Sequence, residues 1–229
     1  MIFTRDKGLK SKTKYRSIWA DIIGVLVTVI VFILPFYFLV VNAAKSQEES
    51  FRLNMSPPKK WLLFQNIAKV VSDYDWHVLR ATWNSLILTI FSVFFLIIIS
   101  GMTGFVMHRK RDNTSAVANF LVLTALVIPP AIVPTIWVLQ RIGLYKTLAG
   151  MIAIEVAYGL AFAVLIFRNF IGTIPKEIDE AAIVDGCTGW NLYFRIIFPL
   201  LKPVSITIGI IAAAAVFNDF TDPLYFLPG

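Results

Sequence analysis

Long apolar runs alternate with polar segments along the chain. The apolar runs are Ile22–Val41, Leu86–Met107, Ser115–Leu139, Thr147–Phe167 and Pro203–Phe217. A helix of about 20 apolar residues crosses the roughly 30 Å hydrocarbon core of a bilayer. Strands of an outer-membrane barrel would instead alternate apolar and polar residues, and these runs do not. The pattern therefore predicts an all-α, polytopic helical membrane protein with about five transmembrane helices, the last of them short.

Composition and charge agree with this class. The chain is 58% hydrophobic and 15% charged, whereas soluble domains carry roughly a quarter charged residues. A net charge of +7 is compatible with nucleic acid, but lysines and arginines that flank spans explain it better. With the N-terminus inside, the inner segments hold 13 of the 21 basic residues. We therefore expect a multi-pass membrane protein with a cytoplasmic N-terminus and no nucleic-acid partner.

The runs divide the chain into three predicted parts. Residues 1–17 form a basic cytoplasmic segment, residues 18–82 hold the first span and an external loop, and residues 83–229 form the main transmembrane domain. Asn84 and Ser85 are candidate caps for the second span, and Gly101 and Gly104 allow close helix contact within it.

Two features interrupt the spans. Pro129 and Pro130 break the third run at mid-depth, which is typical of a moving or pathway-lining segment, or of a simple packing kink. Glu155 is the one acid well inside an apolar run, and an intramembrane carboxylate suggests a substrate or ion role. It lies near the outer end of its span, so it can also simply reach the interface.

The polar segment 168–202 has its own helical pattern. Thr173 is a candidate N-cap, and Gly186 is a natural helix stop. A second helical stretch, 190–197, precedes Pro199. Ile178, Ala181, Ala182 and Asp185 share one face of the first helix at helical spacing. Such a face is low enough for another protein to dock on. In an ordinary interfacial helix, the acids Glu177, Asp179 and Glu180 would only complement the helix dipole.

The same segment carries a spaced motif. Glu180-Ala181-Ala182, Gly186 after three residues, and Ile196-Ile197-Phe198-Pro199 after nine more resemble the Glu-Ala-Ala loop of ATP-binding-cassette importer permeases. Phe198 stands where that family usually has leucine. Further segments resemble the carbohydrate branch of the family, in particular the second permease of maltose and glycerol-phosphate importers. These segments are 84–86, 128–130, 143–144, 174–178 and 218–224.

The resemblance implies a function in carbohydrate uptake by alternating access. Residues Glu180, Ala181, Ala182, Asp185, Gly186, Ile196 and Pro199 would couple this chain to a cytoplasmic ATPase dimer. That dimer would use ATP and Mg²⁺, while this chain would bind no cofactor and no metal and would catalyse nothing. A homologous second permease, an extracytoplasmic sugar-binding protein and the lipid membrane are the other implied partners. The resemblance also implies a location in the bacterial cytoplasmic membrane.

The substrate pathway is implied less directly. Asn218 and Asp219 can hydrogen-bond sugar hydroxyls and Phe217 can stack on a sugar, with Glu155, Pro129 and Pro130 as further candidates. Asn218 and Asp219 are equally suited to cap a helix end. The family usually has a sixth span after this segment, so the resemblance implies a truncated chain or a permease without that helix. A non-transporting fragment or structural subunit is the alternative, and an intramembrane enzyme would need more convergent acids, histidines or serines than the spans contain.

Overall fold

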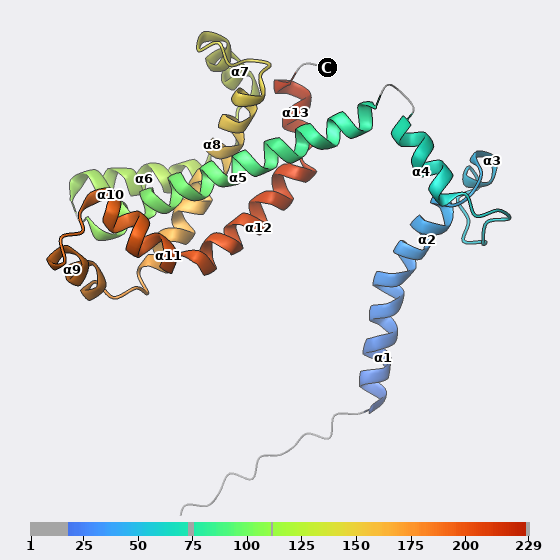
Figure 1. Ribbon diagram of the computed structural model, residues 1–229, viewed down its shortest axis with the longest axis horizontal. Helices are drawn as coiled ribbons and strands as arrows, with labels where there is room; N and C mark the ends of the chain where they lie inside the picture. Colours follow the sequence, from blue (N-terminus) through green and yellow to red (C-terminus); the bar gives the residue numbers. More distant parts are fainter. Residues whose placement is uncertain (1–17, 73–75, 111, 228–229) are drawn as a thin grey trace, which may run out of the picture. The chain divides into compact units, whose positions relative to one another are not determined.

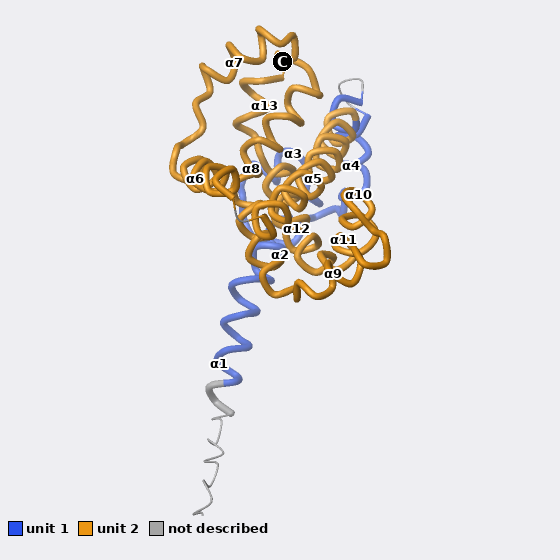
Figure 2. Tube along the Cα trace, turned by 90° about the vertical axis from the view of Figure 1, so that its left-hand side faces the viewer, with its two compact units in different colours: residues 1–79 blue, residues 80–229 orange. Residues whose placement is uncertain are grey.

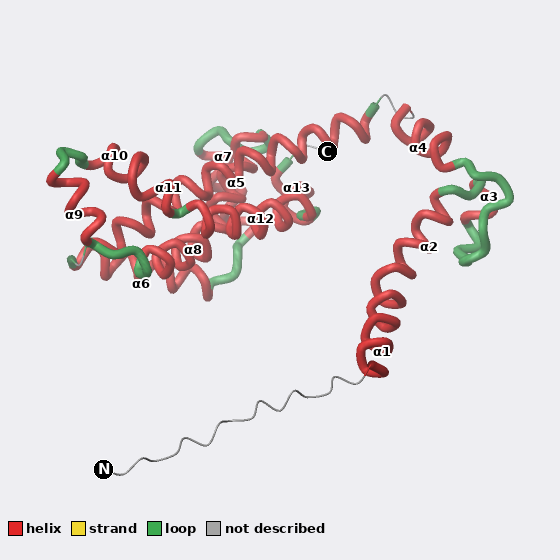
Figure 3. Tube along the Cα trace, turned by 60° about the horizontal axis from the view of Figure 1, so that its bottom comes forward, coloured by secondary structure: helices red, strands yellow, loops and turns green. Residues whose placement is uncertain are grey.

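The computed structural model describes residues 18–72, 76–110 and 112–227, with only the backbone given for residues 18–20. These residues form helices joined by loops, and none of the described residues lies in a strand (Figure 3). The fold class predicted from the sequence, all-α, is confirmed. The predicted basic segment 1–17 lies outside the described residues.

The chain divides into two compact units, residues 1–79 and residues 80–229 (Figure 2). The three-part domain division predicted from the sequence stays a prediction.

The first unit is built around one long apolar helix. It consists of α1 (Ile18–Thr28), the π-helical segment η1 (Val29–Ile33) and α2 (Leu34–Ala43). The continuous helix over residues 21–43 is long and apolar enough to cross a membrane. Pro35 lies in the first turn of α2 and lacks the N–H that would continue the helical hydrogen bonds, so the wider π-helical turns lie just before it.

The loop after α2 is held by polar side chains. The Asn66 amide donates to the carbonyls of Ala43 (2.9 Å) and Lys45 (2.8 Å), which ties α4 (Leu63–Ser72) to the end of α2. The buried Lys45 ammonium donates to Asn42 Oδ1 and to both oxygens of Asn54. A short helix, α3 (Gln47–Ser50), lies between Lys45 and Asn54 along the chain. Polar side chains therefore hold the part of the predicted loop between residues 42 and 66 in an ordered structure.

In the second unit, three long helices carry the fold. They are α5 (His77–Arg109), which begins just before the unit boundary, α8 (Leu148–Ile171) and α12 (Lys202–Asn218) (Figure 1). Asn84 and Ser85 lie inside α5, so their predicted role as caps is wrong: the helix extends two turns further toward the N-terminus than the apolar run does. The close approach predicted at Gly104 is confirmed, because a Cβ there would lie 3.0 Å from Phe167 Cβ.

The predicted third span is not one helix. It is divided into α6 (Asn113–Val127) and α7 (Ile132–Arg141). Ile128 ends α6 in an extended conformation because Pro129 disfavours the helical region for the residue before it. At the other end of α6, the Asp112 carboxylate accepts a hydrogen bond from the Ser115 amide, and this bond, helped by Lys110, lowers the pKa of Asp112 to about 2.

The remaining helices lie at the two ends of α8. After its C-terminus come α9 (Glu177–Val184), α10 (Gly189–Asn191), the π-helical segment η2 (Leu192–Ile197) and α11 (Phe198–Leu200), and α13 (Thr221–Phe226) follows α12. Three helices are long and apolar enough to cross a membrane among the residues described, and a fourth span results if the bent pair Gly189–Leu200 and Lys202–Asn218 is counted as one. That number is lower than the predicted five, because α6 alone has only 15 residues.

Two apolar clusters hold the second unit together, one near each end of α8. At the C-terminal end, Phe167, Ile171, Ile197 and Leu201 are fully buried. At the N-terminal end, α5, α7, α8, α12 and α13 contribute the second cluster: Leu88, Leu139, Met151, Ile154, Val216 and Phe226. Each cluster supports one of the candidate sites described next.

Candidate functional site

The first candidate site is the 172–201 segment that follows α8. Its first helix, α9, begins at Glu177 after a turn in which the Thr173 hydroxyl donates to the Phe170 carbonyl. Thr173 therefore closes the end of α8 and does not cap α9, which corrects the predicted cap. Glu177, Asp179 and Glu180 lie in the first turn of α9, where the helix dipole favours acidic side chains.

The face predicted for docking is divided between core and surface. Ala182 is 7% exposed and packs in the apolar cluster of its own chain, and Ile178 is half-buried. Glu180, Ala181, Ile183, Val184 and Asp185 are exposed, and Val184 reaches 86% exposure. The prediction of one docking face that includes both alanines is therefore wrong. The available surface is centred on Ala181 and Val184, with Glu180 beside them.

Gly186 ends α9 as predicted. It has a φ of +84°, and its N–H donates to Ile183 while the Cys187 N–H donates to Ala182. These two bonds form a Schellman motif, in which the left-handed residue is normally glycine. The turn directs the chain into the second helical stretch.

The second stretch buries one of its aromatic side chains, Tyr193, against α5. Tyr193 is buried, and a Cβ on Gly101 of α5 would lie only 2.5 Å from its hydroxyl oxygen. The absence of a side chain at Gly101 therefore lets η2 approach α5. Ile196 is half-buried and Pro199 is exposed at the start of α11.

An ion pair that the sequence analysis missed joins this segment to α5. Arg109 Nε lies 2.6 Å from Asp179 Oδ2, and Nη2 donates to Asp179 Oδ1 (3.3 Å) and to the Ile174 carbonyl (3.1 Å). The two side chains are only 13% and 11% exposed. The sequence places Arg109 at the end of a span, where basic residues are usual, and Asp179 in the first turn of a helix, where acids are usual. Neither position by itself indicates a pair. The pairing needs the tertiary contact between α5 and α9.

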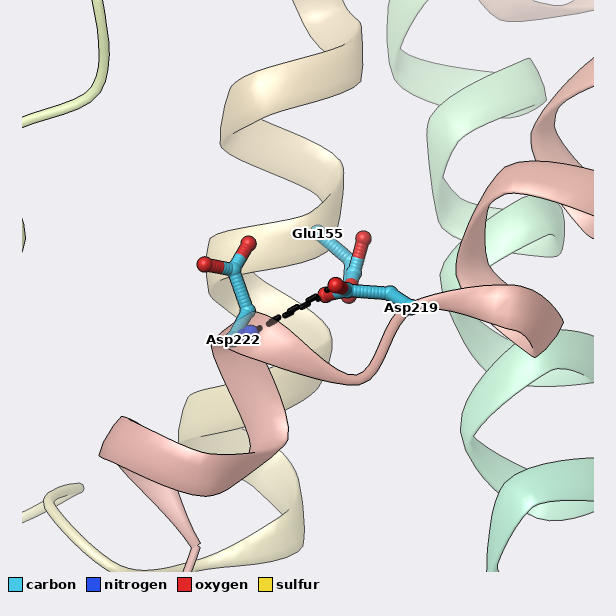
Figure 4. Close-up of side chains that lie close together, drawn as sticks. All are labelled: Glu155, Asp219 and Asp222. Carbon is cyan, nitrogen blue, oxygen red and sulfur yellow. Dashed lines mark hydrogen bonds between the residues drawn. The ribbon is translucent and has the colours of Figure 1, made fainter.

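The second candidate site lies near the N-terminal end of α8. Figure 4 shows Glu155 of α8, Asp219 at the end of α12 and Asp222 of α13, each with a carboxylate oxygen within 4.8 Å of the others. Asp219 accepts hydrogen bonds from the Thr221 and Asp222 amides, so it caps α13. Burial, and secondarily the charge of Asp219, raises the pKa of Asp222, which lies outside the candidate spans.

The structure thus brings together Glu155 and Asp219, two residues that the sequence analysis named separately. Asp222 was missed, although its position three residues after Asp219 is a usual capping distance. Three carboxylates supply hard oxygen donors of the kind that divalent cations accept. Such cations take six or more oxygen ligands, so three carboxylates that each gave one oxygen would leave at least three positions to other donors.

The other predicted pathway residues all lie at exposed positions. Asn218 is exposed, but its amide donates to the Ala214 carbonyl of its own helix (2.7 Å). Phe217 is exposed, and Pro129 and Pro130 are exposed between α6 and α7. A role of these four residues in a substrate pathway stays a prediction.

Comparisons with known proteins agree with this architecture. The sequence profile of the family described as "Binding-protein-dependent transport system inner membrane component" matches residues 82–229. Because this match covers more than half of the chain, the chain belongs to that family.

Two curated relatives carry names from sugar transport. The chain is 28% identical to "Probable starch degradation products transport system permease protein AmyC" of Thermoanaerobacterium thermosulfurigenes, over 86% of this chain and 72% of AmyC. It is 29% identical to "Melibiose/raffinose/stachyose import permease protein MelC" of Bacillus subtilis, over 85% of this chain and 70% of MelC.

A solved structure has a similar fold. It is described as the crystal structure of a bacterial ABC transporter involved in the import of the acidic polysaccharide alginate. The two chains superpose with a TM-score of 0.78 at 19% identity, over 93% of this chain and 75% of the other. Together with the apolar helices, the family identifies a multi-pass membrane protein of a transport system, and the alternative of a non-transporting fragment or structural subunit is not favoured.

Proposed function

We propose that this chain is a permease subunit of an ATP-binding-cassette importer for carbohydrate, and that the exposed face of α9 is its docking surface for the ATPase. The observation that carries the proposal is the structure of α9. A two-turn helix fixed in the core by Ala182 presents an almost fully exposed Val184 beside Glu180. An exposed apolar side chain next to a charge suits burial against a protein partner with a basic residue.

The proposal assigns the chemistry to other subunits. A cytoplasmic ATPase dimer would hydrolyse ATP with Mg²⁺ and push on α9, and a homologous second permease would complete the pathway. An extracytoplasmic binding protein would deliver the sugar. For α9 to face this motor, the chain lies in the cytoplasmic membrane with α9 and the N-terminus on the inner side, as the distribution of basic residues favours.

A carbohydrate substrate is supported by the curated relatives, whose names refer to starch products and to melibiose, raffinose and stachyose. We place the substrate near Asn218, Asp219 and Phe217, with Glu155 beside them, because amide and carboxylate groups bind hydroxyls and aromatic rings stack on sugars. Pro129 and Pro130 would let the segment between α6 and α7 move. None of these groups needs a bound metal or cofactor for this role.

The test is cross-linking and transport in the assembled complex. Val184→Cys is expected to cross-link to the ATPase subunit, whereas Lys146→Cys, which lies before the N-terminus of α8, is not. Uptake of a labelled oligosaccharide into vesicles should require this chain and ATP. A chain that assembles with the ATPase but supports no uptake of any sugar would support a structural subunit instead. Failure of the cross-link at Val184 would remove the docking role.

A further inference from the structure

The exposed face of α9 explains how a partner can dock, but it does not explain how a push on so short a helix reaches the spans. α9 has eight residues, and isolated helices of this length are marginal in water. Its position therefore depends on the contacts it makes with the rest of the fold. Ala182 provides one such contact through the apolar cluster.

A second, polar contact is made by Arg109. Its guanidinium bridges two parts of the 172–201 segment, since it contacts the Asp179 carboxylate on α9 and the Ile174 carbonyl in the turn before α9. Arginine is suited to this geometry because its donors are fixed in one plane. The pair is mostly buried, so it is screened far less by salt than a surface pair.

Arg109 is also the last residue of α5, the longest helix described. Twenty-one residues before it, Leu88 packs in the cluster that contains Val216 and Phe226. At 1.5 Å per residue, α5 spans about 32 Å between Leu88 and Arg109. One continuous helix thus connects α9 to the end of the unit that holds Glu155, Asp219 and Asp222.

We propose that Arg109 is a positioning residue that locks α9 to α5, so that a push on the exposed face of α9 moves α5 as a rigid body. This inference rests on the proposed docking role of α9. The contact of Tyr193 with Gly101 supports α5 as the receiving helix, because it is a second place where the same segment is pressed against α5. Movement of α5 would then shift Leu88 and the packing around the acidic cluster.

The test uses the complex of this chain with its partner subunits, reconstituted in vesicles. Arg109→Gln removes the guanidinium, and Lys110→Gln is the matched control. Lys110 is the next residue, carries the same charge and forms an exposed pair with Asp112 at 3.0 Å. We expect R109Q to lower sugar uptake per ATP hydrolysed by about tenfold, in the range of coupling changes along packed networks. K110Q should leave this ratio unchanged.

The ratio separates positioning from a purely structural role. If Arg109 only stabilised the fold, R109Q would lower the amount of complex, and the uptake per ATP of the surviving complex would equal that of K110Q. That result would overturn the proposal. Arg109→Lys keeps one charge without the planar fork, and it should recover part of the ratio. If R109Q does not accumulate, Asp179→Asn is expected to show the same loss of coupling, and a normal ratio in D179N would also overturn the proposal.

The cross-link at Val184 distinguishes failure of the docking role of α9 from failure of the positioning role of Arg109. In R109Q the cross-link should persist, because the exposed face of α9 is retained while its connection to α5 is lost. A cross-link with normal coupling in R109Q would reject only the role of Arg109. The absence of a cross-link in the unaltered protein would reject the docking role itself.

Discussion

The two ends of α8 show opposite solutions to charge in an apolar protein. After its C-terminus, the Asp179 carboxylate is paired with Arg109: Oδ2 lies 2.6 Å from Nε, and Oδ1 accepts a hydrogen bond from Nη2. Near its N-terminus, Glu155, Asp219 and Asp222 bring three acids together, and no basic partner of this cluster is found in the described part of the chain. Opposite charges at close range favour one fixed geometry, whereas like charges destabilise the arrangement they share. The first end is therefore held by a favourable charge pair, whereas the second brings together groups whose charges oppose one another.

The largest effect is expected at the turn that fixes the α9 end. Gly186→Pro requires a φ near −65°, but the turn needs +84°, so the Schellman motif should be lost. We expect sugar uptake to fall more than tenfold while the chain remains in the membrane. Gly186→Asn is the control, because asparagine tolerates the left-handed region. Vesicle uptake measures both variants, and normal uptake in G186P would show that the turn does not position α9.

The next effect tests how closely the segment is pressed on α5. Gly101→Ala places a Cβ 2.5 Å from the Tyr193 hydroxyl, and such overpacking costs about 1–3 kcal/mol. The double variant G101A/Y193F removes the hydroxyl and should recover most of the loss. Thermal unfolding of the purified protein in detergent provides the measurement. Equal destabilisation of the single and double variants would contradict the contact between η2 and α5.

The smallest effect concerns the acidic end. Because the pKa of Asp222 is raised above its ordinary value of 3.8, the folded state binds its proton more tightly than the unfolded state does. The tighter proton binding by Asp222 therefore stabilises the folded state. This stabilisation is fully present below pH 3.8 and is lost as the pH rises through the higher pKa of the folded state. In Asp222→Asn this stabilisation should vanish. The measurement is the melting temperature at several values between about pH 3.5 and 7, the range in which the Asp222 carboxyl titrates. In D222N the melting temperature should depend less on pH than in the unaltered protein. An unchanged pH dependence would show that Asp222 is not the group responsible.

The predictions that were confirmed depend on local properties of the chain, namely the length of an apolar run and the backbone constraints of proline and glycine. The apolar runs located α8 within a few residues, and Pro129 and Gly186 each ended a helix where a single backbone constraint demands it. The predictions failed where a local signal competed with packing. Asn84 and Ser85 resembled caps, but α5 continues through them, and Ala182 resembled part of a docking face, but it fills the core.

The sequence by itself determined the class of this protein, the approximate position of its apolar helices and the turn after α9, because hydrophobic length, proline and glycine act over a few neighbouring residues. Only the tertiary structure decided which charges meet. Arg109 and Asp179 are 70 residues apart, and Glu155 reaches Asp219 and Asp222 only because α8 packs beside the junction of α12 and α13. The energy of such pairs depends on distance and burial in space, and neither is encoded in the spacing along the chain.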